Sequence, residues 1–148
     1  MKRRPAQATS LPAAFFELTK PNVTCMIVVS TALGYYLGGK GIHDFHRFLL
    51  TLLGSTLVSS GAGALNHYAE KETDSLMNRT KFRPIPTGFI LPATAMNFGI
   101  VVIIIGVLLL WFSINALTAF LALLTVNLYL FVYTPLKRIT WLNTSIGA

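Results

Sequence analysis

Charged residues are scarce in this chain of 148 residues, and acidic ones are the scarcest. Only 11% of the residues are charged and five are Asp or Glu, whereas 53% are hydrophobic. Soluble globular domains carry about 25% charged residues, which keep their surfaces in water. The shortage therefore excludes an ordinary soluble domain and indicates a membrane protein whose main solvent is the lipid bilayer.

Cysteine is also nearly absent, since Cys25 is the only one, and an intrachain disulfide is thereby excluded. The net charge of +7 is the one feature that suggests nucleic acid. Its distribution along the chain, however, is typical of a membrane topology signal rather than a basic binding face. We therefore expect no nucleic-acid partner.

Long apolar runs are what the chain has in place of charge. Four of them are long enough to cross about 30 Å of hydrocarbon as helices. A lone spanning segment must be helical, because lipid offers its backbone no hydrogen-bond partners. The sequence predicts an all-α membrane protein with about four spans, roughly Asn22–Gly39, Phe48–Tyr68, Ile90–Phe112 and Ile114–Tyr133.

The cations predict the orientation, because Lys and Arg in short loops stay on the cytoplasmic side. Two of the twelve, Lys40 and Arg47, lie in the first loop. The other ten lie in the N-terminal tail, the second loop and the C-terminal tail: Lys2, Arg3, Arg4, Lys20, Lys71, Arg79, Lys81, Arg83, Lys137 and Arg138. Residues 1–21 are thus predicted to be a cytoplasmic tail. A bacterial inner membrane is expected, with the mitochondrial inner membrane as the alternative.

Three of the five acidic residues, Glu70, Glu72 and Asp74, lie within five positions of one another. If the second helix continues past Tyr68, Asn66, Glu70 and Asp74 share one face, because they are spaced four residues apart, and Glu72 falls nearly opposite. Two carboxylates and an amide oxygen are hard ligands suited to Mg²⁺. The alternative is that they are ordinary interfacial charges paired with nearby cations.

The residues on either side of this cluster suggest what such a metal site would bind. Arg79, Lys81 and Arg83 follow it and are suited to holding phosphate. On the membrane side the same helix face continues through small residues, Ala62, Ser59 and Ser55. That face either leaves room for a long hydrocarbon chain or packs closely against another helix. Gly34 and Gly38 form a G-x-x-x-G pattern, which also predicts close helix packing.

The pattern N-x-x-x-[D/E]-x-x-x-D followed by R-T-K-x-R-P-x-P-x-G, from Asn66 to Gly88, resembles the first aspartate-rich motif of the UbiA superfamily of intramembrane prenyltransferases. Two further stretches, "LTKPNVT" (Leu18–Thr24) and "YTPLKRITWLNTSIGA" (Tyr133–Ala148), resemble its haem O synthase branch, the protohaem IX farnesyltransferases. The resemblance extends over nearly the whole chain after about Phe16. It implies that residues 22–148 are part of a UbiA-type transmembrane domain.

The resemblance implies a reaction in which the farnesyl group of farnesyl diphosphate is transferred to a vinyl group of protohaem IX, with water added, giving haem O. It implies that Asn66, Glu70 and Asp74 are catalytic and hold Mg²⁺. It also implies that a set of cations binds the diphosphate: Lys20, Arg79, Lys81, Arg83, Lys137 and Arg138. Tyr68 or Tyr133 would shield the allylic cation, unless they are interfacial anchors.

The chain departs from the family pattern at two positions. Glu70 stands where Asp is usual, and Asn22 stands where an Arg commonly follows Lys-Pro. The family's second aspartate-containing motif is not found in these residues, so we expect this chain to be the N-terminal part of the enzyme. Two alternatives stay open: an aromatic prenyltransferase of quinone synthesis, and a non-catalytic four-helix membrane subunit.

Overall fold

The computed structural model describes residues 10–39, 41–78 and 80–135. Helices make up every regular element in these ranges, which confirms the all-α prediction. Their bounds are α1 Leu11–Leu18, α2 Pro21–Gly38, α3 Phe45–Ala69, α4 Lys71–Leu76, α5 Pro92–Ser113, α6 Ala116–Asn127 and the π-helix η1 Leu128–Tyr133.

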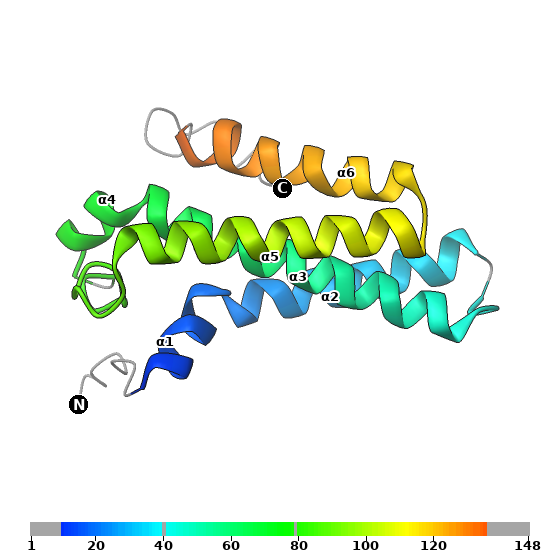
Figure 1. Ribbon diagram of the computed structural model, residues 1–148, viewed down its shortest axis with the longest axis horizontal. Helices are drawn as coiled ribbons and strands as arrows, with labels where there is room; N and C mark the ends of the chain where they lie inside the picture. The colour runs from blue at the N-terminus through cyan, green and yellow to red at the C-terminus, as the bar shows by residue number, and fades with distance from the viewer. Residues whose placement is uncertain (1–9, 40, 79, 136–148) are drawn as a thin grey trace.

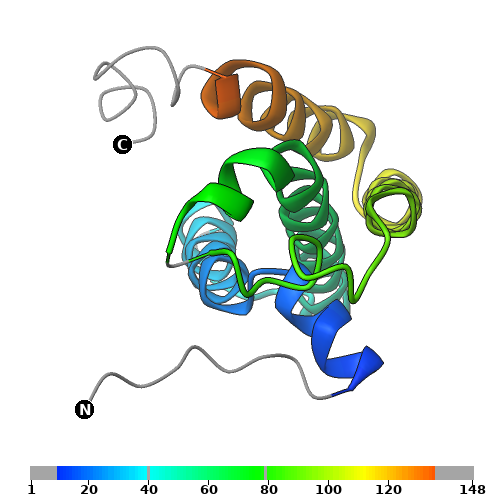
Figure 2. The same ribbon diagram turned by 90° about the vertical axis from the view of Figure 1, so that its left-hand side faces the viewer.

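Helix α3 is the centre of the bundle and contacts every other helix. It lies between α2 and α5, and α6 covers α3 and α5 from above (Figure 1). Viewed from one end, α4 and the segment that follows it lie across the ends of the long helices (Figure 2). Helix α1 lies at this same end, so the candidate site residues before α2 and after α3 are brought together there.

Among the described residues, three helices are long and apolar enough to cross a membrane: Phe45–Ala69, Pro92–Ser113 and Ala116–Tyr133. They agree closely with three of the four predicted spans. The fourth, Asn22–Gly39, is helical as α2 but is not among the three. Polar residues such as Asn22, Thr24 and Thr31, together with glycines and tyrosines, lower its hydropathy. By length and composition the described residues thus contain three spans, and the crossing of the membrane by α2 stays a prediction.

Close packing of small residues occurs between α3 and α5. A Cβ atom at Gly61 would stand 2.6 Å from the carbonyl oxygen of Gly99, so the two backbones pass at a distance that only glycine permits. The predicted packing role of Gly34 and Gly38 was wrong for the described residues. A Cβ at either position meets nothing within 4 Å.

Helix α1 lies in the predicted N-terminal tail, where no helix was expected. Ser10 caps it by accepting a hydrogen bond from the backbone N–H of Ala13, and Ala14 and Leu18 are fully buried. They pack in one apolar cluster with residues from α3, α5 and the segment between α4 and α5: Ala64, Ala95, Ile85 and Ile90. This cluster fixes α1 and the α4–α5 segment against the same end of α3.

Candidate functional site

The predicted spacing of Asn66, Glu70 and Asp74 is present, although the helix that was expected to carry all three is divided. Helix α3 ends at Ala69, and Glu70 lies between α3 and α4 with φ −93° and ψ 4°. The N–H of Glu70 still donates to Asn66 O at 2.9 Å, and that of Asp74 to Glu70 O at 2.8 Å. The division at Glu70 therefore preserves the four-residue register.

Burial separates these three residues from the fourth polar group of the cluster. Asn66, Glu70 and Asp74 are 2%, 9% and 3% exposed, whereas Glu72 is exposed. Carboxylates are almost never buried unless a cation or hydrogen-bond donors compensate them. The buried side of this turn is therefore the side on which cations must gather.

Asn66 is held in one orientation by two partners. Its Nδ2 donates to Thr134 Oγ1 at 3.1 Å, and Thr134 Oγ1 in turn donates to the carbonyl oxygen of Tyr129 at 2.9 Å. Its Oδ1 accepts a hydrogen bond from Nζ of Lys20. Because the NH₂ group is engaged by Thr134, the amide oxygen faces the cation, which is the orientation that a metal ligand requires.

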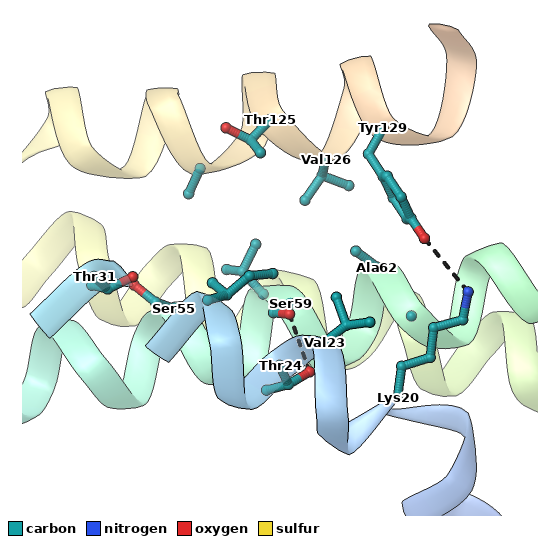
Figure 3. Close-up of a pocket in the computed structure, with 14 residues that line it drawn as sticks. Lys20, Val23, Thr24, Thr31, Ser55, Ser59, Ala62, Thr125, Val126 and Tyr129 are labelled. Atoms are coloured by element: carbon teal, nitrogen blue, oxygen red, sulfur yellow. Dashed lines mark hydrogen bonds between the residues drawn. The ribbon is translucent and has the colours of Figure 1, made fainter. Parts of the chain in front are cut away.

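Lys20 reaches the site from a backbone conformation that side chains rarely adopt. It is the one non-glycine residue with positive φ in the described ranges (φ 49°, ψ 63°) and stands directly before Pro21. Such a conformation costs about 1–3 kcal/mol and is commonly found at functional sites. From there its Nζ contacts Asn66 and lies 3.5 Å from the hydroxyl of Tyr129 (Figure 3).

Asp74 is paired with Arg83 across the α4–α5 segment. Arg83 Nη1 donates to Asp74 Oδ2 at 2.6 Å, and the Thr80 hydroxyl donates to the Asp74 carbonyl oxygen at 3.0 Å. Pro84 and Ile85, which follow Arg83, are buried. Arg83 is therefore anchored beside Asp74 by its apolar neighbours.

Arg83 also contributes to the electrostatics of α1. Burial raises the pKa of Glu17, and the nearby positive charge of Arg83 acts in the opposite direction. The positive charge of Arg83 thus acts on acids of two different elements, α1 and α4.

The other cations that were predicted to bind the diphosphate are not found beside the buried acids in the described residues. Lys81 is exposed; its Nζ donates to Asn78 Oδ1 at 3.2 Å and lies over the ring of Phe82 at 5.2 Å. Three more, Arg79, Lys137 and Arg138, lie outside the described residues. The structure therefore brings Arg83 to Asp74 and Lys20 to Asn66, and the remaining four stay predictions.

Sequence reasoning missed three residues of this site. Tyr129 and Thr134 belong to the end of the last span, and their contacts with Lys20 and Asn66 depend on the fold. His67 is 2% exposed, and its Nδ1 has no hydrogen-bond partner in the part of the chain that the structure describes. An ionisable residue inside a spanning helix is itself a functional signal, so the sequence alone could have identified His67 as a candidate.

A cavity of about 280 Å³ extends from this site into the bundle, between α2, α3 and α6. Lys20 and Tyr129 lie at one end, and Ser55, Ser59 and Ala62 of α3 line its length (Figure 3). The small-residue face of α3 therefore does both things that the sequence suggested: part of it packs against another helix, and part of it leaves room for a hydrocarbon chain. Ser59 packs against α2 through a 3.1 Å contact with the Thr24 hydroxyl, and the same face borders an open space.

The donor set of Asn66, Glu70 and Asp74, which Lys20 connects to the cavity, fits Mg²⁺ in its chemistry. Two carboxylates and one oriented amide oxygen lie on one buried side of the α3–α4 turn, and one or two carboxylates with substrate oxygens are the usual ligands of this ion. Within the described ranges no group of three His, Cys, Asp or Glu residues gathers closely enough for a metal. A site here therefore depends on Asn66 and on oxygens from a substrate.

Comparison with known proteins gives a consistent result. The sequence model of the UbiA prenyltransferase family matches residues 27–148. A protoheme IX farnesyltransferase of Solibacter usitatus is 41% identical over 90% of this chain and 49% of that relative. The mitochondrial protoheme IX farnesyltransferase of Homo sapiens is 40% identical over 99% of this chain and 33% of its own length.

A third relative, a protoheme IX farnesyltransferase of Leptospira biflexa, is 45% identical over 88% of this chain and 46% of its own length. The chain thus spans between one third and one half of the relatives it matches. No solved structure matches it. Because the family model covers most of the chain, including Asn66, Glu70, Asp74 and Arg83, the chain belongs to the UbiA prenyltransferase family.

Proposed function

We propose that the complete protein transfers the farnesyl group of farnesyl diphosphate to a vinyl group of protohaem IX, giving haem O and diphosphate. One observation carries this proposal: Lys20 stands at the end of a largely apolar cavity between helices and contacts Asn66, which lies beside the turn that carries the buried carboxylates Glu70 and Asp74. A molecule with an anionic head and a long apolar tail matches that arrangement. The identity of the acceptor is supported by the names of the relatives.

Binding of the diphosphate is the first task of the site. We assign it to Lys20, which contacts Asn66, and to Arg83, which is paired with Asp74. Four further cations are suggested by the family pattern: Arg79, Lys81, Lys137 and Arg138. Asn66, Glu70 and Asp74 would hold Mg²⁺, which supplies positive charge to the diphosphate when bound. Pyrophosphate oxygens would complete its ligand set.

Stabilisation of the leaving group is the second task. As the allylic C–O bond breaks, its electron pair stays on the diphosphate, and the fixed charges of Lys20 and Arg83 stabilise it. These charges act most strongly because the site is largely removed from water. The new C–C bond forms between C1 of the farnesyl group and the terminal carbon of the vinyl group, and water adds to the other vinyl carbon and releases a proton.

The aromatic residues near the head of the cavity have a place in this scheme. The rings of Tyr129 and Tyr133 are stacked with centroids 5.6 Å apart, and the Tyr129 hydroxyl faces Lys20. An aromatic face attracts a cation, so this pair is suited to shield the allylic carbon as positive charge develops. Tyr68 instead carries the ammonium group of Lys71 over its ring at 4.5 Å. Of the two tyrosines singled out by sequence, we therefore favour Tyr133.

We further propose that the site faces the cytoplasm, or the matrix in a mitochondrial relative, because most cations belong to the loops at this end. The bacterial inner membrane is the proposed location. The human relative is named as mitochondrial, which supports the alternative.

The test is a direct assay of the complete protein in detergent or nanodiscs, supplied with farnesyl diphosphate, Mg²⁺ and reduced haem B. Formation of haem O, identified by mass, is the expected result. A matched reaction with 4-hydroxybenzoate as acceptor tests the quinone-pathway alternative. Prenylation of the benzoate with haem B untouched would refute the proposed acceptor while leaving the diphosphate site in place.

A further inference from the structure

The cavity between α2, α3 and α6 has two unlike ends (Figure 3). At one end the Lys20 ammonium group and the Tyr129 hydroxyl face each other. At the other end Thr31 of α2 and Ser55 of α3 lie next to each other, well away from any charged residue among those that line the space. A ligand with one negatively charged end can therefore bind in the cavity in only one orientation, with its charged end at Lys20.

The wall between these ends is apolar although several of its residues carry hydroxyls. The Thr24 hydroxyl donates to the Thr19 carbonyl at 2.9 Å and contacts Ser59, and the Thr125 hydroxyl donates to the Leu121 carbonyl at 2.8 Å. These groups are thus engaged by the protein itself. The remaining lining is aliphatic, which suits a hydrocarbon chain and gives little to hold a polar ligand.

The depth of the cavity is fixed by the two helices that border it. The lining residues run from Lys20 to Thr31 along α2, ~16 Å at 1.5 Å per residue, and from Ser55 to Gly63 along α3, ~12 Å. An extended chain advances roughly 1.2 Å per bond, so the main chain of a farnesyl group is ~13 Å long, that of geranyl ~8 Å and that of geranylgeranyl ~18 Å. The farnesyl chain lies between these two lengths, and the geranylgeranyl chain exceeds both.

We propose that Thr31 and Ser55 form the end of the prenyl-chain pocket and set its length limit at the farnesyl group. This inference rests on the proposed function only in placing the diphosphate at the Lys20 end. It assigns the selection of chain length to the small and medium side chains at two positions on facing helices. Neither position belongs to the acidic motif or to its cations.

The experiment measures binding rather than turnover, in the complete protein reconstituted in nanodiscs. Non-hydrolysable thiolodiphosphates with geranyl, farnesyl and geranylgeranyl chains compete against a labelled farnesyl analogue, and inorganic diphosphate reports on the head site alone. Ser55→Phe and Thr31→Phe each fill the far end from a different helix. Leu33→Phe is the matched control, because Leu33 lies two residues beyond Thr31 and is exposed on the outside of α2.

For the unaltered protein we expect farnesyl to bind at least tenfold more tightly than geranylgeranyl. Each blocking variant should weaken farnesyl about tenfold or more relative to geranyl, because the last isoprene unit loses its buried place. Thr31→Ala should narrow the gap between geranylgeranyl and farnesyl. Inorganic diphosphate should bind equally in all of them, and Leu33→Phe should resemble the unaltered protein.

Equal affinity of the unaltered protein for farnesyl and geranylgeranyl chains overturns the inference. So does an unchanged ranking of chain lengths in both Ser55→Phe and Thr31→Phe while diphosphate binding is retained. If one variant fails to insert, the other tests the same end from the opposite helix. Because haem takes no part in the measurement, a protein that ranks the chains as expected but makes no haem O refutes the proposed acceptor and leaves the length limit standing.

Discussion

Neutralising Asp74 tests the site most directly, because this side chain has both a proposed catalytic role and a visible structural one. Asp74→Asn keeps the size of the residue and removes the charge that faces Arg83 at 2.6 Å. Loss of charge stabilisation in a transition state costs on the order of 3 kcal/mol, or about a hundredfold in rate. We expect at least that loss in haem O formed per unit of inserted protein.

The same change must also affect folding, and the structure indicates by how much. Removing one partner of a fully buried ion pair costs about 3–5 kcal/mol. The side chain of Arg83 is 24% exposed, so water relieves part of that penalty, and we expect ~1–3 kcal/mol of destabilisation. Turnover is therefore normalised to inserted, folded protein, measured by thermal unfolding in the same detergent.

Two further variants separate a metal site from a general need for negative charge. Glu70→Gln should reduce turnover as Asp74→Asn does, because both residues lie on the buried side of the turn. Glu72→Gln, on the exposed side, should leave turnover near normal. A Mg²⁺ titration of each variant completes the assay. If Glu72→Gln proved as damaging as Asp74→Asn, or if all three kept near-normal rates, the buried acids would be no more than paired interfacial charge.

Three other predictions test the fold, the completeness of the site and the topology. Gly61→Val should destabilise the protein by a few kcal/mol, because a Cβ at position 61 would stand 2.6 Å from the α5 backbone. Gly34→Val should not, because a Cβ there has open space around it, and unfolding temperatures of the two variants test this difference. The 148-residue chain alone should make no haem O, because its relatives are two to three times longer, and haem O from the purified chain would contradict this. Reporter fusions at residues 41–47 and 71–83 should lie on opposite sides of the membrane, with the second in the cytoplasm; a periplasmic signal there would contradict the orientation.

Local periodicity made the spans and the acidic register predictable. The apolar runs of α3, α5 and α6 can only be helices in a bilayer, and residues four apart on a helix share a face wherever the helix is placed. Even the division at Glu70 leaves the Asn66–Glu70–Asp74 spacing intact, because the backbone hydrogen bonds at both steps are retained. Predictions that depend only on the hydrogen bonding of one segment were therefore reliable.

Contacts between distant segments were not predictable in this way. The hydrogen bond between Asn66 and Thr134 joins α3 to the end of the last span, and nothing within either segment specifies the other as its partner. The packing role given to Gly34 and Gly38 failed for a related reason. A small-residue pattern permits close approach but does not determine which helix will use it, and α3 and α5 use their own glycines instead.

Lys20 shows how a local signal and a tertiary contact combine. The family resemblance implied that Lys20 binds the diphosphate. The structure adds that its backbone is left-handed, which separates α1 from α2. Its carbonyl oxygen accepts from the N–H groups of Val23 and Thr24, both at 3.0 Å, so the strained turn also begins α2. The cost of this conformation is offset by the buried packing of α1 on one side and by the contact with Asn66 on the other. The turn therefore places a cation at the head of the cavity because the elements on both sides of it are held, which explains why α1 belongs to the site although it contributes no ligand.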